Sequence, residues 1–260
     1  MNIAIIGHGK MGKMIEKAAI ERKHRITAIV DPLIAESSVL MGTGYYKTIE
    51  ESNSLHDADA AIEFTVPATA MPNIRALAAL KIPAIIGTTG WYDKLDEVKN
   101  IIDDAGASLL WASNFSPGVN IFNRIAWYAA QLFNTFPEYD IGGFESHHNK
   151  KMDSPSGTAQ TLVEGVLSRV GRKKTAVWET LNRAPAPDEL HYPSLRVGSV
   201  PGIHSLIFDS TADTIEITHT ARSREAFASG AILAAEWLTR EENRKGVFTI
   251  DEMLNDILGI

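Results

Sequence analysis

A glycine turn between an apolar run and a helical pattern constrains the fold of this chain more than any other feature. The turn fits the spacing G-x-G-x-x-G and consists of Gly7, His8, Gly9, Lys10, Met11 and Gly12. An apolar run at residues 3–6 precedes it, and apolar residues at helical spacing follow it as far as residue 22. Glycines in this context permit a tight turn and a close approach of the backbone to a pyrophosphate. The pattern predicts a dinucleotide-binding βαβ unit, and a glycine-rich turn without a ligand is the alternative.

The first part of the chain repeats this alternation of short β-rich runs and helical patterns. We expect helices at residues 10–22, 68–80 and 94–105, and strands at residues 3–6, 26–30, 60–64, 84–86 and 108–111. Such alternation is typical of βαβ units that share a parallel sheet. The predicted fold class is therefore α/β, with a Rossmann-type doubly wound parallel sheet.

The pattern changes after Ser116, Pro117 and Gly118. A long helix at residues 119–133 and β-runs at residues 139–144, 205–208 and 214–218 indicate a second, α+β domain, while an apolar helix at 226–238 is expected to pack back on the first. We therefore expect a dinucleotide-binding domain at residues 1–115 plus 225–260 and a substrate-binding domain at residues 116–224. Hinges are expected near residues 115–118 and 223–226.

Asp31 closes the second expected strand, about 20 residues after the glycine turn, where a carboxylate can accept hydrogen bonds from ribose hydroxyls. A 2′-phosphate would be repelled by Asp31, and residues 32–36 offer no arginine or lysine to compensate. These observations favour NADH as the cofactor and leave NADPH possible. The alternative is that Asp31 only caps a turn before Pro32.

Polar and glycine-bearing loops follow the later strands, at the sheet edge where ligands of open α/β sheets bind. We expect the nicotinamide half of the cofactor to lie there, with the ring of Phe115 flanking it. Turn formation alone is the alternative reading of these loops. The expected cofactor contacts in them are Gly87, Thr88, Thr89, Ala112, Ser113, Asn114 and Phe115.

The charge balance excludes whole classes of partner. Asp and Glu exceed Lys and Arg by 32 to 25, a net charge of -7, which argues against nucleic acid and against an anionic membrane surface. The absence of cysteine rules out disulfides and thiolate metal sites. The apolar run at the N-terminus is too short for a signal peptide or a membrane span, so we expect a cytoplasmic protein.

A dense cluster of histidine and lysine follows the first β-run of the second domain. It contains His147, His148, Lys150 and Lys151, in an otherwise acidic chain. A solvated charged surface is one alternative. A metal site is another, but adjacent histidines in a strand point to opposite faces and could not easily share an ion, so no metal is expected.

A helix start follows the cluster, with Ser or Thr as its cap and Pro155 in its first turn. Its exposed N–H groups would form an anion pocket suited to one or two carboxylates. Lys151 and the two histidines beside it could donate a proton to the atom left electron-rich by hydride addition. This is the chemistry of reducing a conjugated imine or alkene that carries one or two carboxylates.

The same segment carries a resemblance to a known family. Residues 145–159 read E-S-H-H-N-K-K-M-D-S-P-S-G-T-A. This is similar to the signature of the 4-hydroxy-tetrahydrodipicolinate (dihydrodipicolinate) reductases, E-A/S-H-H-x-x-K-x-D-A/S-P-S-G-T-A. The resemblance covers essentially the whole chain and continues in the glycine turn and in residues 64–65, 87–90, 114–120, 196–198, 202–204 and 216–219.

The resemblance implies roles for particular residues. His147 would be the catalytic proton donor or acceptor, and Lys151 a proton donor that also contacts the substrate. His148, Gly157 and Thr158 would hold the substrate carboxylates. The resemblance further implies NAD(P)H-dependent reduction of 4-hydroxy-tetrahydrodipicolinate in lysine and diaminopimelate biosynthesis, by a homotetramer assembled through the sheet of the second domain.

Two positions depart from the family pattern. The glycine turn is one residue shorter than the common G-x-x-G-R/K-M-G, so the phosphate contacts are expected to shift by a residue. Pro32 stands where many members carry a basic residue that meets a 2′-phosphate, which again favours NADH.

Two rival functions remain at this point: another two-domain dehydrogenase acting on a sugar or homoserine, and a noncatalytic NAD-binding redox sensor. His204 and His219 are left out of the expected catalytic set, because a lone histidine is at least as often a satisfied core group.

Overall fold

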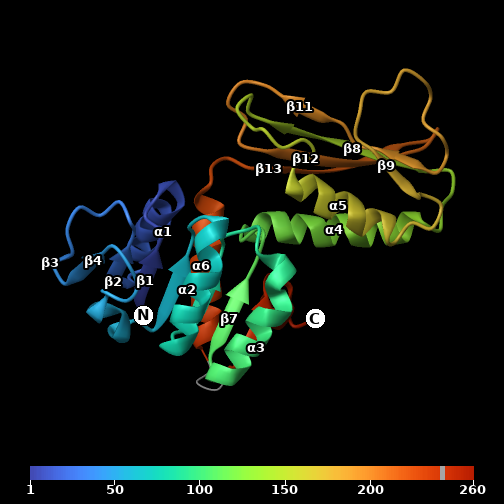
Figure 1. The fold of residues 1–260 in the computed structure, drawn as a ribbon. Helices are drawn as coiled ribbons and strands as arrows, with labels where there is room; N and C mark the ends of the chain where they lie inside the picture. Colours follow the sequence, from blue (N-terminus) through green and yellow to red (C-terminus); the bar gives the residue numbers. More distant parts are fainter. Residues whose placement is uncertain (241–243) are drawn as a thin grey trace. The chain divides into compact units, whose positions relative to one another are not determined.

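The computed structural model describes residues 1–240 and 244–260. The chain forms two compact units, shown in Figure 1. Unit 1 combines Met1–Ser116 with Glu225–Ile260, and unit 2 is Pro117–Arg224. The chain thus passes between the units at residues 116–117 and again at residues 224–225.

Unit 1 is built on an eight-stranded sheet with the order β14-β7-β6-β5-β1-β2-β4-β3. All neighbouring strands are parallel except β3, which runs antiparallel to β4 at one edge. The strands are β1 (Asn2–Ile6), β2 (Arg25–Val30), β3 (Ser38–Leu40), β4 (Thr43–Tyr46), β5 (Ala60–Glu63), β6 (Ala84–Ile86), β7 (Ser108–Trp111) and β14 (Gly246–Thr249).

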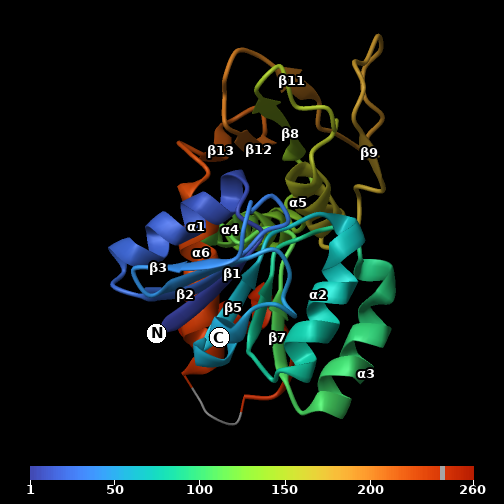
Figure 2. The same ribbon diagram turned by 60° about the vertical axis from the view of Figure 1, so that its left-hand side comes forward.

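Helices cover both faces of this sheet, as Figure 2 shows. One core cluster joins the sheet to α1, α6 and α7, and the other joins it to α2 and α3. Ile3, Ala4 and Ile5 in the central strand β1 have no exposed surface, as a strand covered on both faces requires. The helices are α1 (Lys10–Glu21), α2 (Pro67–Ala79), α3 (Leu95–Ala105), α6 (Glu225–Thr239) and α7 (Ile250–Leu258), with short 3-10 turns η1 (Asn53–Asp57) and η2 (Tyr92–Lys94).

The strand order reverses beside β1. The chain first builds outward through β2 to β4 and β3, then returns to β5 on the other side of β1 and continues to β6 and β7. In a doubly wound sheet this reversal marks the crevice, at the carboxyl ends of the strands, where a dinucleotide binds. The predicted Rossmann-type sheet is confirmed.

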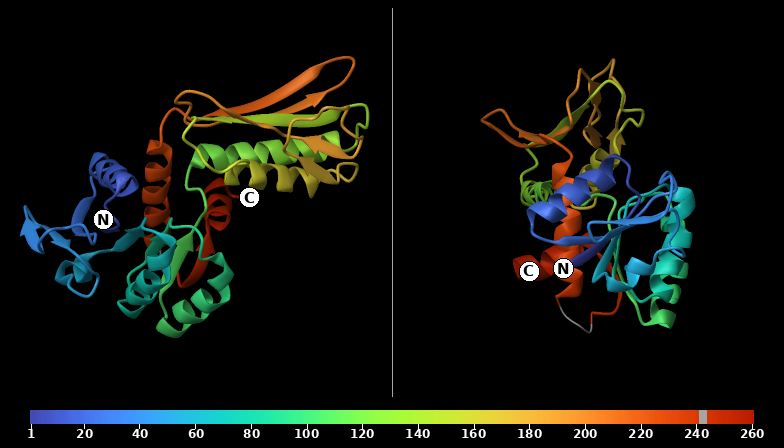
Figure 3. Two further views of the ribbon diagram at one scale, coloured as in Figure 1. Left: turned by 45° about the horizontal axis from the view of Figure 1, so that its top comes forward. Right: turned by 90° about the vertical axis from the view of Figure 1, so that its left-hand side faces the viewer.

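Unit 2 has a four-stranded sheet with the order β11-β8-β12-β13 and a separate parallel pair, β9 and β10. Helices α4 and α5 pack against one face of the larger sheet, as Figure 3 shows. In α4, the buried residues Phe122, Ala126 and Ala130 recur every four positions and so face the core together. The elements are α4 (Pro117–Phe133), β8 (Asp140–His147), α5 (Gly157–Leu167), β9 (Thr175–Val177), β10 (Glu189–His191), β11 (Ser194–Arg196), β12 (Ile203–Asp209) and β13 (Thr214–Thr220).

The main predicted helices and strands are confirmed to within a few residues, with β8 the largest extension. The sequence patterns missed β3, β4, β9, β10, β11, β14 and α7. Most of these strands have only three or four residues, too few to show a period of two. None of the helices in the described residues has the length and apolar character needed to cross a membrane.

Two glycines of the turn should respond differently to an added methyl group. A Cβ at Gly12 would lie closer to the carbonyl oxygen of Gly7 than van der Waals contact allows, whereas a Cβ at Gly9 would meet no atom within 4 Å. We expect Gly12→Ala to lower the free energy of unfolding by about 1–3 kcal/mol through overpacking. Gly9→Ala should change it by less than about 0.5 kcal/mol. Denaturant unfolding of both variants measures the difference, and equal losses would contradict this explanation.

Candidate active site

The glycine turn uses its glycines in two different ways. Gly7 has φ +92°, a conformation that favours glycine, and its N–H donates to the carbonyl of Val30 at 2.7 Å. Side chains at Gly7 or Gly12 would collide with neighbouring backbone, so these two positions serve the packing of strand against helix. Gly9 is the N-cap of α1, is exposed and has open space around it. The first N–H groups of α1 therefore have room for an anion such as a pyrophosphate.

Asp31 anchors the glycine turn. Its Oδ2 accepts from the backbone N–H of His8 at 2.6 Å, and its Oδ1 accepts from that of Leu33 at 2.9 Å. The second bond is the local turn contact that the alternative interpretation required. Each carboxylate oxygen keeps a further lone-pair direction, so binding of ribose hydroxyls remains compatible with both bonds.

The remaining residues of the turn lie at the start of α1. The ring of His8 bonds Glu16 at 2.8 Å, which holds the imidazole against the helix. Lys10 is exposed and Met11 is half-buried against the core.

The loops after β5 and β6 are tied to each other. The Oγ1 of Thr88 accepts from the backbone N–H of Thr65 at 2.7 Å, and the Thr88 side chain is buried. Gly87 lies against the ring of Phe64, where a Cβ would collide. Thr89 is exposed at the same strand end. The structure therefore gives Thr88 a scaffolding contact and leaves Thr89 as the accessible hydroxyl.

Glu63 lies beneath these loops and was missed by the sequence patterns. It is fully buried at the end of β5 and accepts hydrogen bonds from the Thr65 hydroxyl and, at 3.2 Å, from the Asn73 amide. Its Oε2 has no hydrogen-bond partner. Burial raises the pKa of Glu63 above its ordinary value, and the bonds from Thr65, Thr88 and Asn73 offset only part of that effect. A single acidic residue ending an apolar strand was the signal that could have identified it.

The loop after β7 corrects one expectation. Phe115 is 1% exposed and packs in the core of unit 1 with its ring 5.8 Å from that of Phe64. Its ring therefore does not flank a nicotinamide in this conformation, because the core encloses it. Ala112 is also buried, Ser113 is exposed, and the Oδ1 of Asn114 accepts from the backbone N–H of Ser116 at 2.8 Å.

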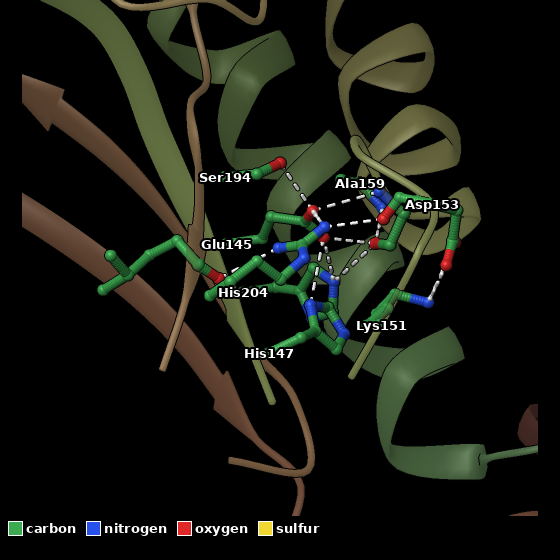
Figure 4. Close-up of polar contacts among 10 residues, drawn as sticks. Glu145, His147, Lys151, Asp153, Ala159, Ser194 and His204 are labelled. Atoms are coloured by element: carbon green, nitrogen blue, oxygen red, sulfur yellow. Dashed lines mark hydrogen bonds and ion pairs between the residues drawn. The ribbon is translucent and has the colours of Figure 1, made fainter. Parts of the chain in front are cut away.

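A buried carboxylate organises the histidine cluster of unit 2, as Figure 4 shows. Glu145 on β8 has no exposed surface, and its oxygens accept from Ser194 at 2.6 Å and from Arg196 at 3.1 Å. The backbone N–H of Ser156 also donates to it, at 3.0 Å, and the Ser156 hydroxyl donates as well. One side chain thereby joins β8, β11 and the start of α5.

These donors keep Glu145 ionised. Burial by itself would raise the pKa of the carboxyl, but hydrogen bonds from His204, Ser156 and Ser194 outweigh it and hold the pKa well below its usual range. The cluster thus contains one carboxylate that is ionised near pH 7.

His147 is the last residue of β8 and is 7% exposed. Its Nδ1 lies 3.4 Å from the Oε2 of Glu145, and its ring stands edge-on to that of His204, with ring centres 5.1 Å apart. Burial lowers the pKa of His147 to about 4, and Glu145 opposes this while His204, Lys151 and Arg196 reinforce it. The imidazole is therefore neutral near pH 7.

Lys151 supplies the positive charge beside this ring. Its Nζ donates to Asp153 at 2.8 Å, and about a quarter of the side chain is exposed. His148 is half-buried and Lys150 is exposed. The structure thus brings Lys151 close enough for its ammonium group to act on the pKa of His147.

The start of α5 differs from the expected helix start in one respect. Ser156 is the N-cap, and its hydroxyl accepts from the N–H of Ala159 at 3.2 Å. Pro155 therefore precedes the cap and does not lie in the first turn, so that expectation is wrong. Gly157 is exposed with no atom within 4 Å of a Cβ, which leaves room for a carboxylate at the first residue of the helix. Thr158 follows it, half-buried.

The residues that could hold a metal ion differ from those considered in the sequence. The sequence argument concerned His147 and His148, but it is Glu145, His147 and His204 whose ligand atoms lie within 4.8 Å of one another among the described residues. The carboxylate oxygens are already engaged by serine and arginine donors, as in a hydrogen-bond network. The absence of a metal stays a prediction.

Both parts of the chain match the same protein family. Residues 1–115 match the family model described as dihydrodipicolinate reductase, N-terminus, and residues 118–254 match that described as dihydrodipicolinate reductase, C-terminus. A 4-hydroxy-tetrahydrodipicolinate reductase of Christiangramia forsetii is 37% identical over 259 residues, which cover 99% of each chain. One from Staphylococcus aureus is 33% identical over 97% of this chain and 100% of its own.

Solved structures support the fold alone. A dipicolinate-bound dihydrodipicolinate reductase from a Paenisporosarcina species superposes with a TM-score of 0.77 at 20% identity, covering 96% of this chain and 97% of that one. An amine dehydrogenase from Mycobacterium smegmatis gives a TM-score of 0.63 at 9% identity, covering 96% and 95%.

The buried Glu63 predicts an unusual dependence of stability on pH. Its folded-state pKa is raised above the ordinary 4.5, so on raising the pH the unfolded chain releases this proton first and wild-type stability falls from about that pH upward. A glutamine accepts the same hydrogen bonds and does not ionise. We expect Glu63→Gln to be at least as stable as the wild type at pH 8, and relatively less stable at about pH 4.

Thermal unfolding at the two pH values measures this effect. Glu189→Gln is the matched control with the opposite sign, because a hydrogen bond from Arg183 lowers the pKa of Glu189 to about 2. The wild type should gain stability over that control as the pH rises. If Glu63→Gln loses stability at pH 8, the carboxyl is ionised and stabilising.

Proposed function

Because the chain belongs to the dihydrodipicolinate reductase family, we propose that it reduces 4-hydroxy-tetrahydrodipicolinate to tetrahydrodipicolinate with a reduced nicotinamide cofactor. The reaction is a step of lysine and diaminopimelate biosynthesis. The observation that carries the proposal is the cluster around Glu145, which sets a neutral imidazole and a lysine ammonium beside an open helix N-terminus. A small dicarboxylate needs both cationic and N–H partners, and the cluster offers them.

In the proposed substrate site, the carboxylates are held by the first N–H groups of α5 at Gly157 and Thr158, with His148 and Lys151 beside them. Over the reaction the substrate gains one hydride and one proton and loses its 4-hydroxyl as water. Lys151 leaves Asp153 for the substrate and donates that proton. His147 is neutral and accepts a hydrogen bond or a proton at its ring nitrogen. Enclosure of this cluster excludes water from the proton transfer, since Glu145 and His147 are buried.

Unit 1 is proposed to hold the cofactor. Its residues fit a dinucleotide, because Gly9 leaves open space at the first N–H groups of α1 and Asp31 directly follows β2. When bound, the nicotinamide supplies the hydride for the ring. The proposed contacts are Gly7, His8, Gly9, Lys10, Met11, Gly12, Asp31, Gly87, Thr88, Thr89, Ala112, Ser113, Asn114 and Phe115, the last through its backbone.

We further propose a homotetramer formed through the sheet of unit 2. Its strand β13 is an edge strand with mostly exposed side chains, including Ile215 at 44%. An unpaired edge of this kind is a template for pairing with another chain. Light scattering in solution tests the state, and a monomer would refute it. The proposed location is the cytoplasm, where the nicotinamide cofactor is available.

The rival functions give different results in the same assay. A noncatalytic sensor would bind NADH without oxidising it, and another dehydrogenase would turn over a different substrate. No residue described above favours either of them.

Replacement of Lys151 tests the proton donor. Lys151→Ala should reduce kcat by about 100-fold or more, the usual effect of losing a general acid, while the Kd for the cofactor stays within about twofold. The assay follows the loss of reduced-nicotinamide absorbance with freshly generated substrate, and His147→Ala should also lose turnover. The matched control is Lys150→Ala, which removes an exposed neighbouring lysine and should leave kcat nearly unchanged. Equal loss of cofactor binding in Lys151→Ala would show that Lys151 is misplaced.

Replacement of Asp31 tests the cofactor preference. The wild type should have the higher kcat/KM with NADH, because the Asp31 carboxylate would lie against the 2′-phosphate of NADPH. Asp31→Asn removes the charge and should shift the ratio toward NADPH by about tenfold, since like-charge juxtaposition costs several kcal/mol. Thermal unfolding serves as the control for the lost turn contacts of Asp31. A wild type that prefers NADPH would refute the argument.

A further inference from the structure

Glu145 and His204 occupy one row across the sheet of unit 2. His204 on β12 is the strand partner of Glu145 on β8, and Ser194 on β11 is its partner on the other side. Directly opposite residues of neighbouring strands project to the same face. Glu145 and His204 both meet Ser156 at the start of α5, so this face is the one that α5 covers. The row therefore places two buried titratable groups, Glu145 and His204, next to His147. The proposed reaction uses neither of them directly.

The contacts within the row converge on one carboxylate oxygen. The Oε2 of Glu145 lies 3.4 Å from Nδ1 of His147 and 3.5 Å from Nε2 of His204. His204 is 4% exposed, and its Nε2 also lies 3.3 Å from the Oγ of Ser156. The two imidazole planes meet at 75°. His204 therefore contacts both the carboxylate of Glu145 and the ring of His147, and restricts the orientation of each.

The two nitrogens of His147 have different surroundings. Nδ1 is buried and makes no hydrogen bond in this conformation, and it lies 3.4 Å from the Oε2 of the Glu145 carboxylate. Nε2 lies on the side of Gly202, where a Cβ would come within 3.1 Å of it. A neutral imidazole carries its proton on one nitrogen only, and the hydrogen bond made by one nitrogen decides the state of the other. A carboxylate beside Nδ1 favours the proton there.

We propose that Glu145 and His204 are a positioning pair that holds neutral His147 with its proton on Nδ1, so that the Nε2 lone pair is free to accept from the substrate. The inference rests on the proposed function and deepens it. The other tautomer would direct an N–H toward the substrate, where the Lys151 ammonium is already a donor, and the site would then lack an acceptor. The charged and titratable groups that face His147 are Glu145 on its own strand, His204 on β12, Arg196 on β11 and Lys151 in the following loop.

The tautomer can be observed directly by ¹⁵N NMR of the histidine-labelled full chain, with His147→Gln used to assign the signal. In the wild type we expect a pyrrole-type shift for Nδ1 and a pyridine-type shift for Nε2. Glu145→Gln replaces the carboxylate by an amide that can donate or accept, so both tautomers should become populated. Its kcat should fall about 10- to 100-fold, as for other residues that orient a functional imidazole, with KM for the cofactor within about twofold.

The matched control is Lys173→Met. This variant breaks another ion pair of unit 2, between the buried Lys173 and the exposed Asp140 at 2.5 Å, and so should cost stability without changing the His147 tautomer. If Glu145→Gln does not fold, Glu145→Asp and His204→Asn replace it in both measurements, each with a mixed tautomer expected.

Some outcomes would overturn the proposal. A wild-type signal with the proton on Nε2 is one, and a Glu145→Gln signal unchanged from wild type with kcat equal to that of Lys173→Met is another. A wild type without turnover would refute the proposed function instead, and the NMR signal would still decide the tautomer.

Discussion

A negative charge without exposed surface is the constraint on which unit 2 depends. Hydrogen bonds from Ser194, Arg196 and Ser156 stabilise the ionised form of Glu145, and those donors come from β11 and from the start of α5. Removing any one segment would leave a buried charge short of partners, which is far more costly than losing an ordinary contact. The strand register, the helix cap and the histidine positions therefore depend on one another through Glu145. This explains why one short segment of sequence encodes so much of the site.

The two buried glutamates show how donors decide the state of a carboxyl. Glu63 and Glu145 are both fully buried at or near the end of a strand. Burial raises the pKa of Glu63, because neutral hydroxyl and amide donors offset only part of the desolvation. Hydrogen bonds from His204 and two serines outweigh burial at Glu145, and its pKa is lowered. Unit 1 thus has a buried acid with a raised pKa beside the loops that follow β5 and β6, and unit 2 has a buried acid with a lowered pKa beside the start of α5.

The sequence was sufficient where a local pattern reports a local structure. Glycine spacing after an apolar run predicted the turn at Gly7 and Gly12, and periodicity predicted the long helices. The sequence was not sufficient where a residue's position depends on contacts with distant segments. No local pattern shows that His204 would pair with Glu145, or that Phe115 would turn into the core. Short strands such as β9 and β11 have only three residues, which is too few to show a period of two in the sequence. They form because neighbouring strands pair with them. The roles assigned to His147 and Lys151 rest on the chemistry of that charged segment and on a resemblance, and they stay predictions.

Unit 1 is discontinuous in the sequence, and this has a consequence for how the protein is made. Strand β14, at residues 246–249, pairs with β7, and helix α6 covers β5, β6 and β7. Both elements follow unit 2 in the sequence. During synthesis, domains fold as their residues emerge from the ribosome. Unit 2 has all its elements as soon as residue 224 has emerged, while the first 116 residues wait with one sheet face that only α1 covers and with β7 unpaired on one side. The segment translated first is thus the last to complete its fold, and it is the one that a chaperone would have reason to hold.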